Sequence, residues 1–314
     1  MLSKEETCGK RISLEFCVDF NNNATTTKKK CNFTMDGYAF GAPESEANVR
    51  IVTLHGISPG VSRIRWHKLG ERYNTIYKEG NKNRRKKKVR FVCLDWHSID
   101  RSVDDDSNTE FLTCLPKHIM DVSSSPSDVE EFAVLHATKD RQDWLRGFAK
   151  AVENGACPRT FNDGSRILRS VIEEGLHWGT SSDTQFILAV KSWSGGLGMR
   201  MLADIGRRSC DDDDSFAKNI QGAIIMHPGC FDKGDLQDAM SSGVVKCALM
   251  CWAKDDPLVP YPMAQMYLDA AGSNGNDDKI KLCTYEKGGH HNFDGTESLP
   301  NFDDEVVDWV EKLP

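Results

Sequence analysis

An apolar run that ends abruptly in small residues constrains this chain more than any other feature. Residues 186–190 read Phe-Ile-Leu-Ala-Val, a pattern typical of a buried strand. Residues 192–198 follow as Ser-Trp-Ser-Gly-Gly-Leu-Gly, and the next residues are typical of a helix. A strand that passes into a helix through a serine is the setting of a nucleophile elbow, where strained backbone lifts the hydroxyl clear of the sheet.

Two serines compete for the elbow position. The chain passes close to itself at such a turn, so the residues two before and two after the nucleophile must be small. With Ser194 as the nucleophile those residues are Ser192 and Gly196, and both are small. With Ser192 they are Val190 and Ser194, and the branched valine fits poorly. We therefore predict Ser194 as the nucleophile, with Ser192 as the alternative register and an ordinary glycine-rich turn as the structural alternative.

An acid and a base follow the serine in the order that such a site requires. Asp256 and His290 each come after a strand-like run, where a side chain can reach the carboxyl edge of a parallel sheet. Asp255 is the alternative acid, but Asp256 directly precedes Pro257. His291 is the alternative base, but His290 directly follows a Gly-Gly pair.

With these residues in the order Ser, Asp, His, the chain resembles the α/β-hydrolase superfamily over roughly residues 33–314. Within it, the chain is similar to small serine hydrolases such as the α/β-hydrolase 14 type or dienelactone hydrolases. The resemblance includes the strand and His-Gly turn at 49–56 and the strand at 89–102, where Ser98 and Asp100 replace the glycines of the superfamily. It implies a single α/β-hydrolase domain over residues 1–314, with Ser194 as nucleophile, Asp256 as acid and His290 as base.

The chemistry expected of this site is acyl transfer. His290 would accept the serine proton, and Asp256 would hold the imidazole in its useful tautomer. The N–H groups of Gly195 and Ile57 are the expected donors to the oxyanion. The candidates for substrate contact are His55, Trp193 and His227. The structural alternative for His55 is the ordering of a loop, and that for Trp193 is packing. For His227 the alternative is a buried, hydrogen-bonded ring.

Strand-like and helical segments alternate along the chain. This pattern predicts an α/β fold, with a mainly parallel central sheet and helices on both faces. We expect an antiparallel start at 11–20 and 32–40, and strands at 49–54, 89–95, 185–192, 221–227, 245–252 and 280–285. We expect helices around 62–78 and 164–176, and a last helix from about 303.

Residues 103–160 interrupt this alternation and are predicted to be an insertion. Trp144, Leu145 and Phe148 form an apolar stripe at helical spacing. We interpret the insertion as a helical lid that contributes to the acyl pocket. The alternative is a surface loop packed away from the site.

Composition excludes several other classes of protein. A net charge of −7 argues against a nucleic-acid partner, and no apolar stretch approaches the length of a membrane span. The amino terminus lacks an apolar signal core, and the 11 cysteines include no Cys-x-x-Cys pair. We therefore expect a cytoplasmic protein without disulfides, cofactor or metal. We interpret the basic run at 84–88 as a solvated loop; the alternatives are a patch that binds an anion and a localisation signal. We interpret the acidic run at 211–214 as a solvated loop as well, and the alternative there is a metal site.

The function that the sequence predicts is that of a serine hydrolase. Its expected partner is a small-molecule substrate, a small or medium acyl ester or thioester, cleaved through an acyl-enzyme intermediate. Another bond class, such as an amide or lactone, is the enzymatic alternative. A catalytically silent binding or scaffold protein with the same fold is the alternative outside enzymes, because fold does not guarantee function.

Overall fold

The computed structural model describes residues 9–21, 28–56, 65–71, 73, 87–101, 158–179, 184–208, 214–228, 233–256, 259–272, 279–286 and 300–313. The predicted insertion lies outside the described residues, except that its last three residues begin helix α7. The lid hypothesis therefore stays a prediction.

Eight strands and the helices α7 to α12 make up most of the described chain. The strands are β1 (Lys10–Asn21), β2 (Lys28–Gly41), β3 (Val49–Leu54), β4 (Val89–Arg101), β5 (Phe186–Lys191), β6 (Ile220–Met226), β7 (Ala248–Ala253) and β8 (Ile280–Tyr285). The helices are α7 (Pro158–Ser170), α8 (Ser194–Arg208), α9 (Ser215–Asn219), α10 (Lys233–Ser241), α11 (Pro262–Gly272) and α12 (Pro300–Lys312). A π-helical turn, η3 (Val171–Gly175), continues α7, and a short 3-10 helix, η1 (Glu44–Glu46), precedes β3.

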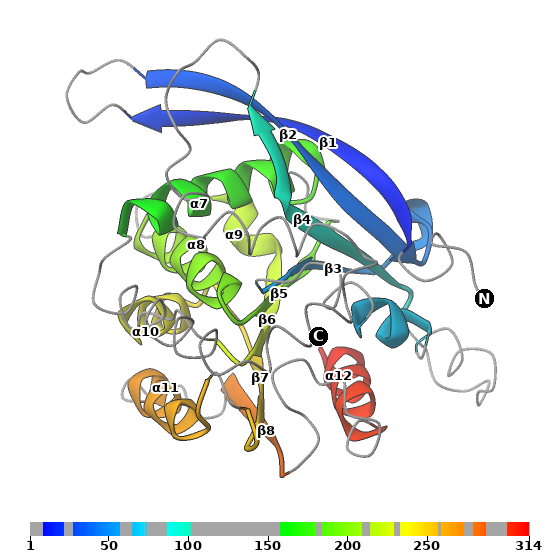
Figure 1. The fold of residues 1–314 in the computed structure, drawn as a ribbon, viewed down its shortest axis with the longest axis vertical. Helices are drawn as coiled ribbons and strands as arrows, with labels where there is room; N and C mark the ends of the chain where they lie inside the picture. The colour runs from blue at the N-terminus through cyan, green and yellow to red at the C-terminus, as the bar shows by residue number, and fades with distance from the viewer. Residues whose placement is uncertain are drawn as a thin grey trace, which may run out of the picture.

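All eight strands form one sheet in the order β1-β2-β4-β3-β5-β6-β7-β8 (Figure 1). The pairs β1–β2 and β2–β4 are antiparallel, and every other pair is parallel. Every residue of β3, β5, β6 and β7 is buried, as expected for parallel strands covered on both faces. The prediction of a mainly parallel α/β sheet is therefore confirmed.

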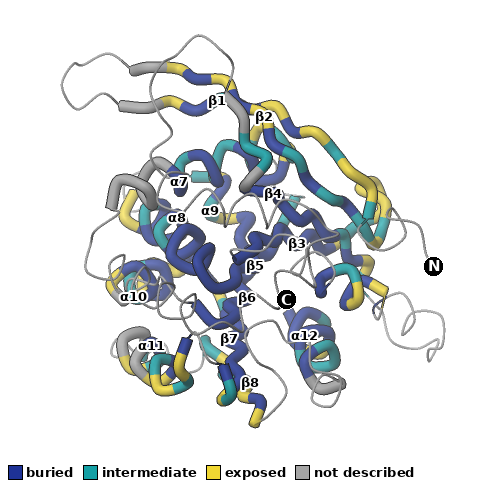
Figure 2. The backbone as a smooth tube through the Cα atoms, viewed as in Figure 1, coloured by how far each residue is buried: buried dark blue, intermediate teal, exposed yellow. Residues whose placement is uncertain are grey.

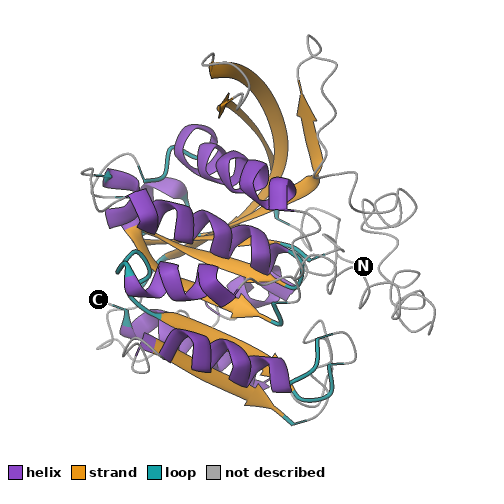
Figure 3. Ribbon diagram, turned by 90° about the vertical axis from the view of Figure 1, so that its left-hand side faces the viewer, coloured by secondary structure: helices purple, strands orange, loops and turns teal. Residues whose placement is uncertain are grey.

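Helices cover both faces of this sheet. Figures 1 and 3 show α7, α8, α10 and α11 on one face, and Figure 1 shows α12 on the other. Alternate residues of each strand serve the two faces. Leu188 of β5 joins the core beneath α8, whereas Ile187 joins the core beneath α12. Figure 2 shows the buried central strands beside the more exposed β1 and β2.

None of the helices in the described part of the chain has both the length and the apolar character of a membrane span.

Strand β4 is longer than the sequence predicts. The expected strand ends at residue 95, but β4 continues to Arg101 because the long strand β2 pairs with it past an irregularity between Thr34 and Asp36. Ser98 secures the irregularity, since its hydroxyl accepts a hydrogen bond from the N–H of Asp36 and donates one to the carbonyl of Asp95, both at 2.7 Å. The extension depends on a partner strand, which local sequence does not report.

Candidate active site

Ser192 occupies the strained position between β5 and α8. Its φ is +54°, in the left-handed region that residues other than glycine rarely adopt. Its N–H donates to the carbonyl of Met226 at 2.9 Å, so the turn is attached to the end of the neighbouring strand β6. This conformation at a strand-to-helix turn is the one expected of an elbow nucleophile.

Ser194, the predicted nucleophile, lies at the start of α8 and points back into the fold. Its Oγ accepts a hydrogen bond from the N–H of Lys191 at 2.9 Å and lies 2.9 Å from the Lys191 carbonyl oxygen. The residue is 1% exposed. Its hydroxyl therefore secures the end of β5, and the geometry favours Ser192 over Ser194 as the elbow residue.

The packing beneath the turn explains why the sequence favoured the other register. With Ser192 as the nucleophile, the sequence rule expects a small residue at position 190, where the chain has valine. Gly198 of α8 supplies the space instead, because it has no side chain. A Cβ on Gly198 would lie 2.4 Å from Cγ1 of Val190. Trp193 is buried there too, with its ring 6.5 Å from that of Trp96. Its burial is consistent with the packing alternative, and the substrate contact at Trp193 stays a prediction.

The loop after β3 touches Ser192. A Cβ placed on Gly56 would lie 3.0 Å from the Cβ of Ser192, so the missing side chain lets the loop approach the elbow. Ile57, the predicted second oxyanion donor, is the next residue and lies outside the described residues. The predicted first donor is already engaged, because the Gly195 N–H donates to the Ser192 carbonyl at 2.9 Å. With Ser192 as nucleophile, the donor expected directly after it is the N–H of Trp193.

His55 holds this loop in place. Its Nε2 accepts a hydrogen bond from the N–H of Trp96 at 2.9 Å, so the ring proton lies on Nδ1, which is 2.5 Å from the carbonyl oxygen of Gly56. Both ring nitrogens are thus engaged with backbone, and the residue is 3% exposed. These contacts agree with the structural alternative, the ordering of a loop, and the substrate contact at His55 stays a prediction.

Asp256, the predicted acid, follows β7 and lies beside His227, which follows β6. His227 Nδ1 is 2.8 Å from Asp256 Oδ2, and neither side chain is exposed. Asp256 Oδ1 accepts a hydrogen bond from the N–H of Val259 at 3.1 Å. His227, a predicted substrate contact, is in the structure a fully buried neighbour of Asp256, and its role stays a prediction. His290, the predicted base, lies outside the described residues.

Three strand ends therefore converge on one edge of the sheet. A strained serine follows β5, a histidine follows β6 and an aspartate follows β7, in a sheet whose strands run in the order given above. The chain has the α/β-hydrolase fold. In this fold the carboxyl edge of the sheet carries the site, and the chemistry depends on the side chains placed there.

Comparisons with known proteins give structural likenesses. No family model matches the chain, and no curated protein matches it. Acyl-protein thioesterase 2 of Zea mays is 14% identical over 87% of this chain and 96% of that one, with a TM-score of 0.44. Dienelactone hydrolase of Anabaena variabilis is 13% identical over 96% and 98%, at 0.43, and esterase PE8 is 16% identical over 89% and 99%, at 0.48. Because these sequence identities and TM-scores are low, the α/β-hydrolase fold is assigned from the order and direction of the strands.

The described residues also include histidines, carboxylates and cysteines, which are the side chains that bind metal ions or form disulfides. Among those residues, no group of three or more His, Cys, Asp or Glu could hold a metal ion. The cysteines described there are thiols: Cys17, Cys31, Cys93, Cys247, Cys251 and Cys283.

Proposed function

We propose that this protein is a serine hydrolase that cleaves a small or medium acyl ester or thioester, with Ser192 as its nucleophile. The observation that carries the proposal is the left-handed φ of +54° at Ser192, at the turn between β5 and α8. Such strain persists only where the surrounding structure enforces it, and it gathers at functional sites. Gly56 supports the proposal, because the absence of its side chain brings the loop after β3 against Ser192.

The proposed reaction begins with attack of Ser192 Oγ on the acyl carbonyl carbon. The base takes the hydroxyl proton as the new C–O bond forms, and returns it to the alcohol or thiol that leaves. Water then cleaves the acyl-enzyme by the same route, releasing the acid and restoring the serine. We assign the base to His290, as the sequence predicts, with Asp256 as the acid that orients it. The oxyanion donors are the N–H groups of Trp193 and Ile57.

His227 has a separate role in this proposal. Its ring is wholly buried beside Asp256, so it is placed to hold the carboxylate rather than to reach a substrate. The structure adds His227 as a second candidate base beside the predicted alternative His291, because its Nδ1 lies 2.8 Å from Oδ2 of Asp256. Assignment of the base to His290 and assignment to His227 predict different pH dependence for the variants His290→Gln and His227→Gln.

Covalent labelling with a fluorophosphonate tests the proposal directly. We expect wild type to label, and mass spectrometry of the digested protein to place the adduct on Ser192. Ser192→Ala should lose labelling and keep its thermal unfolding temperature. The matched variant Ser194→Ala should keep labelling and lose stability, by about 1–3 kcal/mol, because it leaves the buried Lys191 N–H without its acceptor.

Two results would contradict the proposal in different ways. An adduct found on Ser194 would restore the register predicted from the sequence. No adduct on folded wild type, together with no hydrolysis of p-nitrophenyl esters of increasing chain length, would support the catalytically silent alternative.

A further inference from the structure

The imidazole of His55 joins the end of strand β4 to the loop that reaches the elbow. Its Nε2 accepts a hydrogen bond from the Trp96 N–H at 2.9 Å, and its Nδ1 lies 2.5 Å from the Gly56 carbonyl oxygen. Because a carbonyl oxygen can only accept, Nδ1–H is the donor in the second contact. Asp95 Oδ1 lies farther from Nε2, at 3.7 Å. The ring is therefore neutral, with one acceptor and one donor atom, and both are engaged.

The bond to Gly56 acts on a peptide unit beside the proposed nucleophile. The Gly56 carbonyl belongs to the peptide that joins Gly56 to Ile57. Such a peptide is planar and trans, so its N–H points away from its carbonyl. Holding the carbonyl oxygen therefore also fixes the direction of the N–H, which is the second proposed oxyanion donor. A Cβ on Gly56 would lie 3.0 Å from the Cβ of Ser192, so this peptide begins against the elbow.

The bond to Trp96 attaches the ring to a rigid part of the fold. The register between β3 and β4 ends at Leu54 and Leu94, so the Trp96 N–H lies past this ladder and donates to His55 instead. The Trp96 side chain is buried, and its ring lies 6.5 Å from that of Trp193. Trp193 carries the first proposed oxyanion donor. The segments that carry the two proposed donors therefore meet at the end of β4.

We propose that His55 is a positioning residue of the oxyanion hole. Its Nδ1–H orients the Gly56 peptide, whereas its Nε2 only attaches the ring to β4. The inference rests on the proposed hydrolase function and gives the two ring nitrogens separable roles. Donors that are already in place when charge develops need no reorganisation, so their effect falls on the transition state. Loss of the Nδ1–H should therefore lower kcat and leave KM nearly unchanged.

Two amide substitutions separate the roles of the two nitrogens. The side-chain amide of asparagine takes the place of Nδ1, so His55→Asn keeps a donor for Gly56 and loses the acceptor for Trp96. The longer glutamine reaches the place of Nε2, so His55→Gln keeps the acceptor and loses the donor. With p-nitrophenyl acetate and butyrate, we expect kcat of His55→Gln to fall by about 10²–10³-fold, as for the loss of one oxyanion donor. That of His55→Asn should stay within about tenfold of wild type.

Thermal unfolding of the two variants should give the opposite order. His55→Asn leaves the buried Trp96 N–H without its acceptor and should unfold at the lower temperature. Equal kcat in the two variants, or a kcat that follows stability, would make His55 purely structural and overturn the proposal. A change in KM that differs between acetate and butyrate would make it a substrate contact and overturn the proposal as well.

Two measurements keep this test separate from the proposed function and from folding. If wild type gives no fluorophosphonate adduct on Ser192, the hydrolase function itself is contradicted. If wild type labels, and His55→Gln labels as fast as His55→Asn, only the role of His55 is contradicted. Nitrogen NMR of wild type with ¹⁵N-labelled histidine depends on neither variant. It should show His55 as the Nδ1–H tautomer, and the Nε2–H tautomer would overturn the proposal.

Discussion

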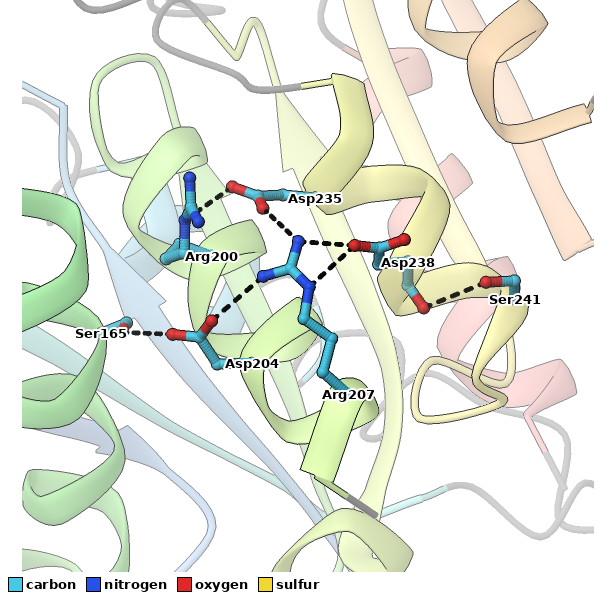
Figure 4. Close-up of polar contacts among 7 residues, drawn as sticks. All are labelled: Ser165, Arg200, Asp204, Arg207, Asp235, Asp238 and Ser241. Atoms are coloured by element: carbon cyan, nitrogen blue, oxygen red, sulfur yellow. Dashed lines mark hydrogen bonds and ion pairs between the residues drawn. The ribbon is translucent and has the colours of Figure 1, made fainter. Parts of the chain in front are cut away.

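Asp235 of α10 lies 3.0 Å from Arg207 of α8, and this contact ties together two of the helices on one face of the sheet (Figure 4). Arg200, two turns earlier on α8, contacts the other Asp235 oxygen at 2.9 Å. Arg207 also contacts Asp204 at 3.1 Å and Asp238 at 2.5 Å. The side chain of Asp235 is 4% exposed, whereas that of Asp238 is 43% exposed.

This difference in burial predicts unequal losses of stability. Asp235→Ala should lower the free energy of unfolding by about 1–3 kcal/mol, because it removes the buried carboxylate that Arg200 and Arg207 share. Asp238→Ala removes an exposed partner of Arg207 and should cost less than about 1 kcal/mol. Urea unfolding monitored by circular dichroism measures both. Equal losses would contradict the view that burial makes Asp235 the centre of this cluster.

Gly198 supplies the next prediction, because its missing Cβ makes room for Val190. Gly198→Ala should destabilise the protein by about 1–3 kcal/mol through overpacking. Combining it with Val190→Ala should cost less than the sum of the two single changes, because each relieves the strain or void left by the other. A double-mutant cycle of urea unfolding checks this. Strict additivity would mean that the two residues do not share the space beneath the elbow.

The proposed acid can be tested against its neighbour in the sequence. Asp256 is buried beside His227, whereas Asp255 is partly exposed. Asp256→Asn should lower kcat for ester hydrolysis by about 10⁴-fold, as expected when a triad acid no longer selects the tautomer of its base. Asp255→Asn should leave kcat within about tenfold of wild type. Comparable losses in both variants would remove the basis for assigning Asp256 as the acid.

The two candidate bases differ in their predicted pH profiles. Activity should rise with pH through the pKa of the base, because only a neutral imidazole can take the serine proton. With His290 as base, His290→Gln should abolish that rising limb. His227→Gln should lower kcat but keep the limb, because the change disturbs only the support of Asp256. Loss of the limb in His227→Gln and its retention in His290→Gln would make His227 the base.

The environment of Cys283 in β8 predicts that the free energy of unfolding falls at alkaline pH. Burial raises the pKa of this thiol to about 11, and the nearby Glu305 carboxylate adds to the rise. The neutral thiol is therefore favoured in the folded protein, whereas in the unfolded chain it ionises near pH 8.5. The resulting stabilisation is complete below about pH 8.5 and is lost as pH rises to about 11, by at most about 3 kcal/mol.

Urea unfolding of wild type and Cys283→Ala between pH 7 and pH 11 checks this expectation. The difference at pH 7 reports the packing lost with the sulfur atom. Above pH 8.5 the stability of the alanine variant should fall less steeply than that of wild type. Parallel curves would mean that the ionisation of Cys283 is not coupled to folding.

Much of the fold followed from the sequence, because the pattern that specifies it is local. The strands predicted at 49–54 and 280–285 have the bounds of β3 and β8, and the other predicted strands appear within a few residues, except that β4 continues to Arg101. A buried strand shows itself as a short apolar run whatever its neighbours are. The setting of the elbow was found in the same way, as an apolar run that meets small residues before a helix.

The register of that elbow and the partners of its neighbours were decided by tertiary structure. The rule that small residues flank a nucleophile assumes which residues of the turn approach each other closely. Here Gly198 of α8 supplies the space that Val190 of β5 needs. The contact between His227 and Asp256 joins residues from different strand ends, and no local pattern reports such a distance. The sequence by itself determined which strands and helices form and which polar residues follow the strands. Only packing between elements decided which serine takes the strained backbone and which histidine lies against the acid, because those outcomes depend on space shared by segments far apart in the chain.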